Sequence, residues 1–376
     1  MATGKRSTTL MLTTTKSSTT TKIPSTTTTT TITTTKEAVW VPTGSMNRAR
    51  IYHTQVTLEN GNVLVVGGTT DTNTALSSAE VYNLSTRLWT TTTSMSTARF
   101  FHTASILANG NVLVVGGTAD IKAGLSSAEV YNPSTGLWTT TGSMSTARFF
   151  HTASILANGN VLVVGGTADS KTGLSSAEVY NPSTGLWTTT GSMSTERYYH
   201  TASILANGNV LVVGGLTGMA LLSSAEVYNI STRLWTTTGS MSTARYYHTQ
   251  VTLANGNVLV TGGTAGNGIA LNSAEVCDPS TGVWTTTGTV NIARLLFTAS
   301  VLTNGSVLVA GGTDFSDNAF SNVEVYNLSA GLWTTAGSMS TARYYHTASI
   351  LTNGNVLVAG GVHGRSTILS SAEVYG

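Results

Sequence analysis

The chain has 376 residues, of which 40% are hydrophobic, and this is enough apolar material for a sizeable buried core. Only 9% are charged, and the formal net charge of +2 is unevenly distributed: five of the 18 Lys and Arg residues, but none of the 16 Asp and Glu residues, lie in residues 1–36. The remaining chain is therefore slightly acidic, which argues against a large basic face and a nucleic-acid partner. No run approaches the ~20 apolar residues of a membrane span, and Cys277, the single cysteine, excludes an internal disulfide.

Residues 1–36 differ in composition from everything that follows. They contain eighteen threonines and few apolar side chains, so we predict a disordered segment. Threonine-rich tracts with Ser and Pro are typical of O-glycosylated stalks, and a plain linker is the alternative. N-x-Ser sequons begin at Asn83, Asn229, Asn304 and Asn327. Together the tail and the sequons favour an extracellular or secreted protein.

From residue 37 onward the sequence repeats seven times with a period close to 50 residues, which indicates a propeller or a solenoid. The first glycine of a Gly-Gly pair recurs at Gly67, Gly116, Gly165, Gly214, Gly262, Gly311 and Gly360. A tryptophan recurs at Trp40, Trp89, Trp138, Trp187, Trp235, Trp284 and Trp333.

One repeat reads as four strands. The stretch TASILANGNVLVV contains two short apolar runs joined at Asn158-Gly159, a pair that supplies the positive φ angles of a tight hairpin. SSAEVYN forms the third predicted strand, NPSTG the turn, and LWTTT the fourth strand with Trp187 as its anchor. Four antiparallel strands in this length correspond to one propeller blade.

The fold class predicted from seven such units is all-β: a closed seven-bladed β-propeller spanning residues 37–376, after the disordered segment 1–36. The repeated part begins with a fourth strand at Val39–Val41 and ends with a third strand at Ala372–Tyr375. We therefore expect the Trp40 strand to complete the last blade and close the ring, which protects the sheet edges.

The pattern M-x-x-x-R-x-x-H-T, N-G-x-V-L-V-x-G-G and E-V-Y-N-x-x-T-x-x-W resembles the kelch repeat over roughly residues 37–376. More narrowly, RYYHTASILANGNVLVVGG is similar to the propeller domain of galactose-oxidase-type proteins. The resemblance implies that the first strand of each blade lies innermost and that the loop before it contributes to a partner-binding face.

An arginine precedes every first strand, and a glutamate precedes Val-Tyr or its equivalent in every third strand. If the arginines ring one end of the channel, they suit a carboxylate or an acidic peptide. The alternative is that each arginine pairs with the glutamate of its own blade. The candidate ligand-binding residues are Arg50, Arg99, Arg148, Arg197, Arg245, Arg294 and Arg343, and the glutamates are Glu80, Glu129, Glu178, Glu226, Glu275, Glu324 and Glu373.

Six of the seven blades carry a histidine three residues after this arginine, and Phe297 stands there in the sixth blade. A ring of imidazoles suggests a metal, but seven similar blades would spread them too widely for one ion, and Phe297 replaces histidine at no visible cost. We therefore expect a packing role. The histidines are His53, His102, His151, His200, His248 and His346.

Resemblance to galactose oxidases implies a second interpretation, because those enzymes bind copper partly through an adjacent Tyr-His pair at this position. Tyr52-His53, Tyr199-His200, Tyr247-His248 and Tyr345-His346 match that pair. The family's site also uses a histidine from a C-terminal domain and a cysteine linked to a second tyrosine. Here the chain stops at Gly376, and Cys277 occupies the tyrosine position of a third strand. Asp71, Asp120, Asp169 and Asp314 provide one carboxylate per loop, fewer than a calcium site gathers.

The function expected from these observations is a non-catalytic binding or scaffold module, because near-identical blades do not supply one asymmetric catalytic constellation. Loops that differ between blades follow the Gly-Gly pairs, and we expect a protein, peptide or glycan ligand at the channel-mouth face that they share with the arginines. We expect a monomer without a cofactor. A copper oxidoreductase of the galactose-oxidase type, or a degenerate relative of one, is the alternative.

Overall fold

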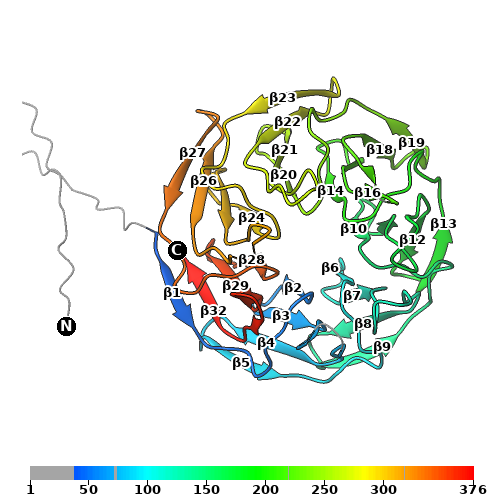
Figure 1. Ribbon diagram of the computed structural model, residues 1–376. Coiled ribbons are helices and arrows are strands. Elements are labelled where there is room, and N and C mark those ends of the chain that lie inside the picture. Colours follow the sequence, from blue (N-terminus) through cyan, green and yellow to red (C-terminus); the bar gives the residue numbers. More distant parts are fainter. Residues whose placement is uncertain (1–37, 72–73, 219, 317) are drawn as a thin grey trace, which may run out of the picture. The chain divides into compact units, whose positions relative to one another are not determined.

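The computed structural model describes residues 38–71, 74–218, 220–316 and 318–376, and Ala38–Gly376 form one compact unit. The expectations for residues 1–36 therefore lie outside the described residues. All regular structure in the described part is β, in seven four-stranded antiparallel sheets arranged around a central axis (Figure 1). The predicted seven-bladed propeller is confirmed.

The strands occupy equivalent positions in every blade. The first strands are β2 (Thr54–Thr57), β6 (Thr103–Ile106), β10 (Thr152–Ile155), β14 (Thr201–Ile204), β20 (Thr249–Thr252), β24 (Thr298–Val301) and β28 (Thr347–Ile350). The second strands are β3 (Val63–Val66), β7 (Val112–Val115), β11 (Val161–Val164), β15 (Val210–Val213), β21 (Val258–Thr261), β25 (Val307–Ala310) and β29 (Val356–Ala359).

The third strands are β4 (Ala79–Asn83), β8 (Ala128–Asn132), β12 (Ala177–Asn181), β18 (Ala225–Asn229), β22 (Ala274–Asp278), β26 (Val323–Asn327) and β32 (Ala372–Tyr375). The fourth strands are β5 (Leu88–Thr91), β9 (Leu137–Thr140), β13 (Leu186–Thr189), β19 (Leu234–Thr237), β23 (Val283–Thr287), β27 (Leu332–Ala336) and β1 (Trp40–Thr43). Two short hairpins, β16 (Leu216–Thr217) with β17 (Ala220–Leu221) and β30 (Val362–His363) with β31 (Thr367–Ile368), follow Gly-Gly pairs. We number the blades 1 to 7 in the order of their first strands.

The first strands lie innermost and form a closed circle, in which each contacts the first strands of the two neighbouring blades, including β28 with β2. The ring closes through the two ends of the described unit. β1 pairs antiparallel with β32, with Trp40 opposite Tyr375 and Thr43 opposite Ala372. This is the pairing that the strand order in the sequence predicts.

The core lies between neighbouring blades. Every residue of the second strands is buried. The side chains of a second strand form hydrophobic clusters with side chains of the next blade. Leu64 and Val66 of blade 1, for example, pack with Val112, Val114 and Tyr131 of blade 2. Because alternate side chains of a strand point to opposite faces, a Val-Leu-Val-Val run supplies both neighbouring interfaces at once.

Two constraints require glycine in the Gly-Gly pair: positive φ angles, and neighbouring atoms that leave no space for a Cβ atom. Gly67 has φ 63° and Gly68 has φ 93°. A Cβ atom on Gly67 would lie 2.5 Å from the Arg99 carbonyl oxygen and 2.6 Å from the His102 ring of the next blade. Only glycine fits both constraints, so the pair sets how closely two blades approach near the axis.

Candidate ligand-binding face

In each blade, the loop that enters the first strand and the loop that leaves the second strand lie on the same face of the propeller. Isolated bridges join the entry to the first strand with the residue after Gly-Gly, as in Ile51 with Thr69 and Phe100 with Thr118. The entry loops and the variable loops after Gly-Gly therefore share a single surface, which we call the channel-mouth face. No helix in the described residues is long and apolar enough to cross a membrane.

The seven arginines lie inside the blades that carry them. Each is 0% exposed and forms an ion pair of 2.7–3.0 Å with the glutamate of its own third strand. In blade 4, Arg197 Nη2 donates to Glu226 Oε1 at 2.9 Å, and Nη1 donates to the Gly214 carbonyl at 3.1 Å. Burial lowers the pKa of Arg197, and the hydrogen bond to Glu226 opposes this shift.

The glutamates use their remaining hydrogen-bonding capacity on the entry loop. Ser194 N donates to Glu226 Oε2 at 2.7 Å, and Thr195 N donates to Oε1 at 3.1 Å. The pair thereby connects the entry loop, the Gly-Gly segment and the third strand. The alternative in the sequence analysis was that each arginine pairs with the glutamate of its own blade, and this is the arrangement in the structure. The arginines expected to bind a ligand, Arg50, Arg99, Arg148, Arg197, Arg245, Arg294 and Arg343, present no exposed guanidinium to one.

The six histidines lie at the seams between blades rather than around the axis. Each Nε2 is 2.7–3.0 Å from the Oγ1 of a threonine at the start of the preceding blade's first strand. Each histidine is only 5–6% exposed. Desolvation lowers the pKa of His151, His248 and His346 to about 3, so the rings are neutral at physiological pH. Their role is to join neighbouring blades.

The seam between blades 5 and 6 lacks this bond because Phe297 replaces the histidine. Thr249 Oγ1 is buried there and has no hydrogen-bond partner among the described residues. The Phe297 side chain takes the position of the histidine ring and packs in a hydrophobic cluster with Leu259 and Val307. The expectation that this replacement has no cost is therefore wrong, since a buried hydroxyl without a partner is unfavourable.

A ring of seven mostly aromatic side chains, which we call the aromatic ring, surrounds the axis on the channel-mouth face; the sequence pattern did not reveal that these side chains contact one another. It consists of the partly exposed residues just before the histidine position: Tyr52, Phe101, Phe150, Tyr199, Tyr247, Leu296 and Tyr345. Consecutive aromatic side chains have ring centroids 3.9–4.6 Å apart from Tyr345 through Tyr52 round to Tyr247. The signal in the sequence is an aromatic residue at this position in six of the seven repeats, four of which form the Tyr-His pairs.

All seven residues of the aromatic ring have positive φ angles of 54–58°. Large side chains rarely adopt this conformation, and such strain persists where the surrounding structure enforces it. Backbone hydrogen bonds between blades hold part of the ring, as from Phe101 N to the Tyr52 carbonyl at 3.2 Å and from Tyr345 N to the Leu296 carbonyl at 3.2 Å. Burial raises the pKa of Tyr199, Tyr247 and Tyr345, so their hydroxyls are neutral hydrogen-bonding groups.

Around this ring the variable loops expose apolar side chains. Ile269 is 56% exposed and Phe315 is 42% exposed, and both lie in loops after a Gly-Gly pair. The aspartates of these loops stabilise turns: Asp169 Oδ1 accepts hydrogen bonds from Lys171 N and Thr172 N, both at 2.9 Å. Within the described ranges, no three His, Cys, Asp or Glu side chains are grouped closely enough to hold a metal ion.

Comparison with known proteins agrees with this architecture. The family model described as the KLHDC2/KLHL20/DRC7 Kelch-repeats domain matches residues 7–215 and 186–361. These matches cover most of the sequence, so the chain belongs to the kelch-repeat family of β-propellers. No curated protein matches it.

Among solved structures, the chain is similar to a copper-bound fungal alcohol oxidase of the AA5 family, described as having catalytic diversity. The TM-score is 0.75 at 18% identity, and the match covers 91% of this chain and 76% of the oxidase. At this level of identity the similarity establishes a shared fold.

Proposed function

We propose that this protein is a binding module that recruits a protein or peptide partner on the channel-mouth face, without catalysis. The observation that carries the proposal is a difference between the residues that all blades share and the residues that vary from blade to blade. The buried arginines and glutamates that all blades share are used in contacts within each blade, whereas this face leaves a ring of mostly aromatic side chains partly exposed and surrounds it with loops that differ between blades, two of which expose Ile269 and Phe315.

The chemistry of this surface suits a partner with apolar and hydrogen-bonding side chains. Tyrosines with neutral hydroxyls offer a flat aromatic surface together with a polar group, a combination enriched in interface hot spots. Ile269 and Phe315 add apolar anchors at the rim. The buried arginines are not part of the proposed surface, so the preference for an acidic ligand that they suggested loses its basis.

A phage-displayed peptide library selected on the full-length protein tests this proposal. We expect peptides that bind the wild type and lose at least about tenfold in affinity for an Ile269→Ser/Phe315→Ser variant, because buried apolar anchors dominate interface energies. Leu186→Ser, on the outer fourth strand and also exposed, serves as the matched control. Peptides that bind the double variant as tightly as the wild type would contradict the assignment of this face.

A copper oxidase is the second candidate, because the fold is shared with one and four Tyr-His pairs are present. The residues fit copper poorly. In each pair the imidazole Nε2 contacts a threonine at a blade seam, while the tyrosine belongs to the aromatic ring. Metal analysis of the purified protein distinguishes the two functions. Stoichiometric copper, together with oxidation of a primary alcohol or a sugar, would favour the oxidase.

A further inference from the structure

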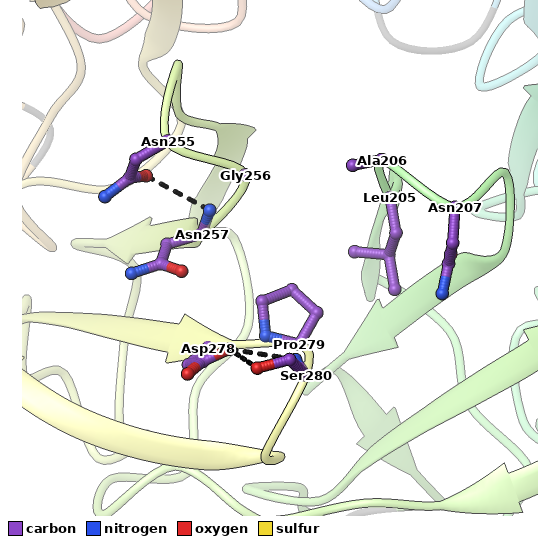
Figure 2. A pocket seen from close by; sticks show the side chains of 9 residues that line it. All are labelled: Leu205, Ala206, Asn207, Asn255, Gly256, Asn257, Asp278, Pro279 and Ser280. Carbon is purple, nitrogen blue, oxygen red and sulfur yellow. Dashed lines mark hydrogen bonds between the residues drawn. The ribbon is translucent and has the colours of Figure 1, made fainter.

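The opposite face of the propeller carries a recurring groove between neighbouring blades. Each groove lies between the Asn-Gly hairpins of two consecutive blades and the turn after the third strand. The largest has a volume of about 310 Å³ and lies between blades 4 and 5 (Figure 2). Two smaller versions, of about 170 and 210 Å³, lie between blades 1 and 2 and between blades 2 and 3.

A proline lines each of these three grooves, and the structure explains the association. In blades 1 and 4 the equivalent residues are Leu84 and Ile230, whose side chains pack against core clusters. Their backbone N–H groups also donate to Asn62 Oδ1 and Asn209 Oδ1, both at 3.3 Å. Proline has no N–H to donate and carries a smaller side chain.

The grooves with Pro133, Pro182 and Pro279 therefore contain an asparagine whose side-chain oxygen has lost its usual donor. In the largest groove this residue is Asn257, and its side-chain amide makes no hydrogen bond to any described residue. An amide left with both donor and acceptor capacity at the wall of a groove is available to a ligand.

The groove between blades 4 and 5 differs from the other two in the residue that precedes its proline. Asp278 replaces the asparagine found at the end of the other third strands that enter such a turn. Its Oδ1 accepts hydrogen bonds from Ser280 N at 2.8 Å and from Ser280 Oγ at 2.6 Å. These bonds lower the pKa of Asp278, so its carboxylate is ionised at neutral pH.

We propose that the groove formed by Leu205, Asn207, Asn257, Asp278 and Pro279 binds a neutral pyranose of a glycan. A sugar hydroxyl can donate to the Asp278 carboxylate and to Asn257 Oδ1, and it can accept from an asparagine Nδ2. The C–H face of a pyranose can pack on Pro279 and Leu205. Since the nine lining residues include one carboxylate and no cation, anionic ligands are disfavoured.

This site is independent of the proposed function, because it lies at the opposite ends of the strands from the channel-mouth face. The Asn255-Gly256 hairpin joins β20 to β21 at one end, whereas Gly262 and the following loop lie at the other. A failure of one proposal therefore leaves the other standing.

Saturation-transfer difference NMR on the full chain with the methyl glycosides of glucose, galactose and mannose tests the proposal. We expect at least one glycoside to bind with a dissociation constant of about 1–10 mM, the range for ligands of this size. Pro279→Ile introduces the side chain that blade 4 has at the equivalent position, Ile230, which should fill the groove and supply a backbone donor to Asn257. Asp278→Asn removes the charged acceptor with little change in shape.

Both variants should weaken binding at least about tenfold, because each removes a hydrogen bond to the ligand or the space for it. Pro133→Leu, which alters only the groove between blades 1 and 2, is the matched control and should bind as the wild type does. Circular dichroism and the melting temperature confirm that each variant is folded. The proposal is overturned if no glycoside binds the wild type, if Asp278→Asn and Pro279→Ile bind as tightly as the wild type, or if Pro133→Leu weakens binding equally.

Discussion

Thr249 and Phe297 occupy the one blade seam at which the threonine hydroxyl finds no imidazole. Thr249 Oγ1 is buried without a partner in the described structure, whereas the equivalent Thr152 Oγ1 lies 3.0 Å from His200 Nε2. The repeated seams thus provide an internal comparison between a satisfied and an unsatisfied version of the same contact.

We predict opposite effects of one substitution at these two seams. Thr249→Val removes a buried hydroxyl that has no partner and should raise the free energy of unfolding by about 1 kcal/mol. Thr152→Val leaves His200 Nε2 without its partner and should lower that free energy by about 1 kcal/mol or more. Urea denaturation of both variants measures the difference. Equal effects would mean that the hydroxyl–imidazole contact contributes nothing to blade packing.

The buried ion pairs lead to a second prediction. Arg197→Met leaves Glu226 buried without its charge partner and should lower the free energy of unfolding by about 3–5 kcal/mol. Arg197→Met/Glu226→Leu should recover part of this loss, because neither charge then remains buried.

Arg48, which is exposed, is the control for Arg197: Arg48→Met should change stability by less than about 0.5 kcal/mol. Denaturant midpoints and slopes measure all three variants. An Arg197→Met variant as stable as Arg48→Met would contradict a structural role for the pair.

Much of the fold was predictable because its determinants are local. Asn-Gly hairpins, Gly-Gly bends and tryptophan strands each depend on a few adjacent residues, so a regular period was enough to count blades and to pair Trp40 with Tyr375. The role of the arginines was not predictable from the sequence. One Arg and one Glu at fixed positions in every repeat fit both a ligand-binding ring of arginines and an ion pair within each blade. Only the 2.9 Å distance between Arg197 and Glu226 distinguishes them.

The seam contacts and the aromatic ring were not predictable in the same way. His200 meets Thr152 of the preceding blade, so the contact depends on how two sheets are placed side by side. Tyr199 and His200 look like one unit in the sequence, yet the positive φ of Tyr199 places the tyrosine at the axis and the histidine in the seam. That backbone conformation has no glycine or asparagine to signal it.

Ring closure through β1 gives a third prediction. Deleting residues 37–42 removes most of the strand that pairs with β32 and exposes a sheet edge of blade 7, so the melting temperature should fall markedly. Deleting residues 1–36 leaves every described strand intact and should have a much smaller effect. Differential scanning calorimetry compares the two deletions. Equal decreases would show that the pairing of β1 with β32 does not control stability.

The histidines predict how stability depends on pH. Burial holds the pKa of His151, His248 and His346 at about 3 in the folded state, against the ordinary value of 6.5 in the unfolded chain. The unfolded state therefore binds protons between these values while the folded state does not. The contribution to stability is complete above pH 6.5 and is lost as the pH falls toward 3.

At pH 5 this linkage should cost about 2 kcal/mol for each of the three histidines, which is large compared with the usual stability of a domain. We expect acid unfolding to begin below about pH 6. His346→Phe, which copies the seam at Phe297, should bind about one proton fewer on unfolding and flatten the pH dependence. Leu186→Ser, at an exposed position that does not titrate, should leave it unchanged. Denaturant titrations from pH 4 to 8 measure both variants, and a stability that stays constant from pH 7 to pH 5 would contradict neutral, buried imidazoles at the seams.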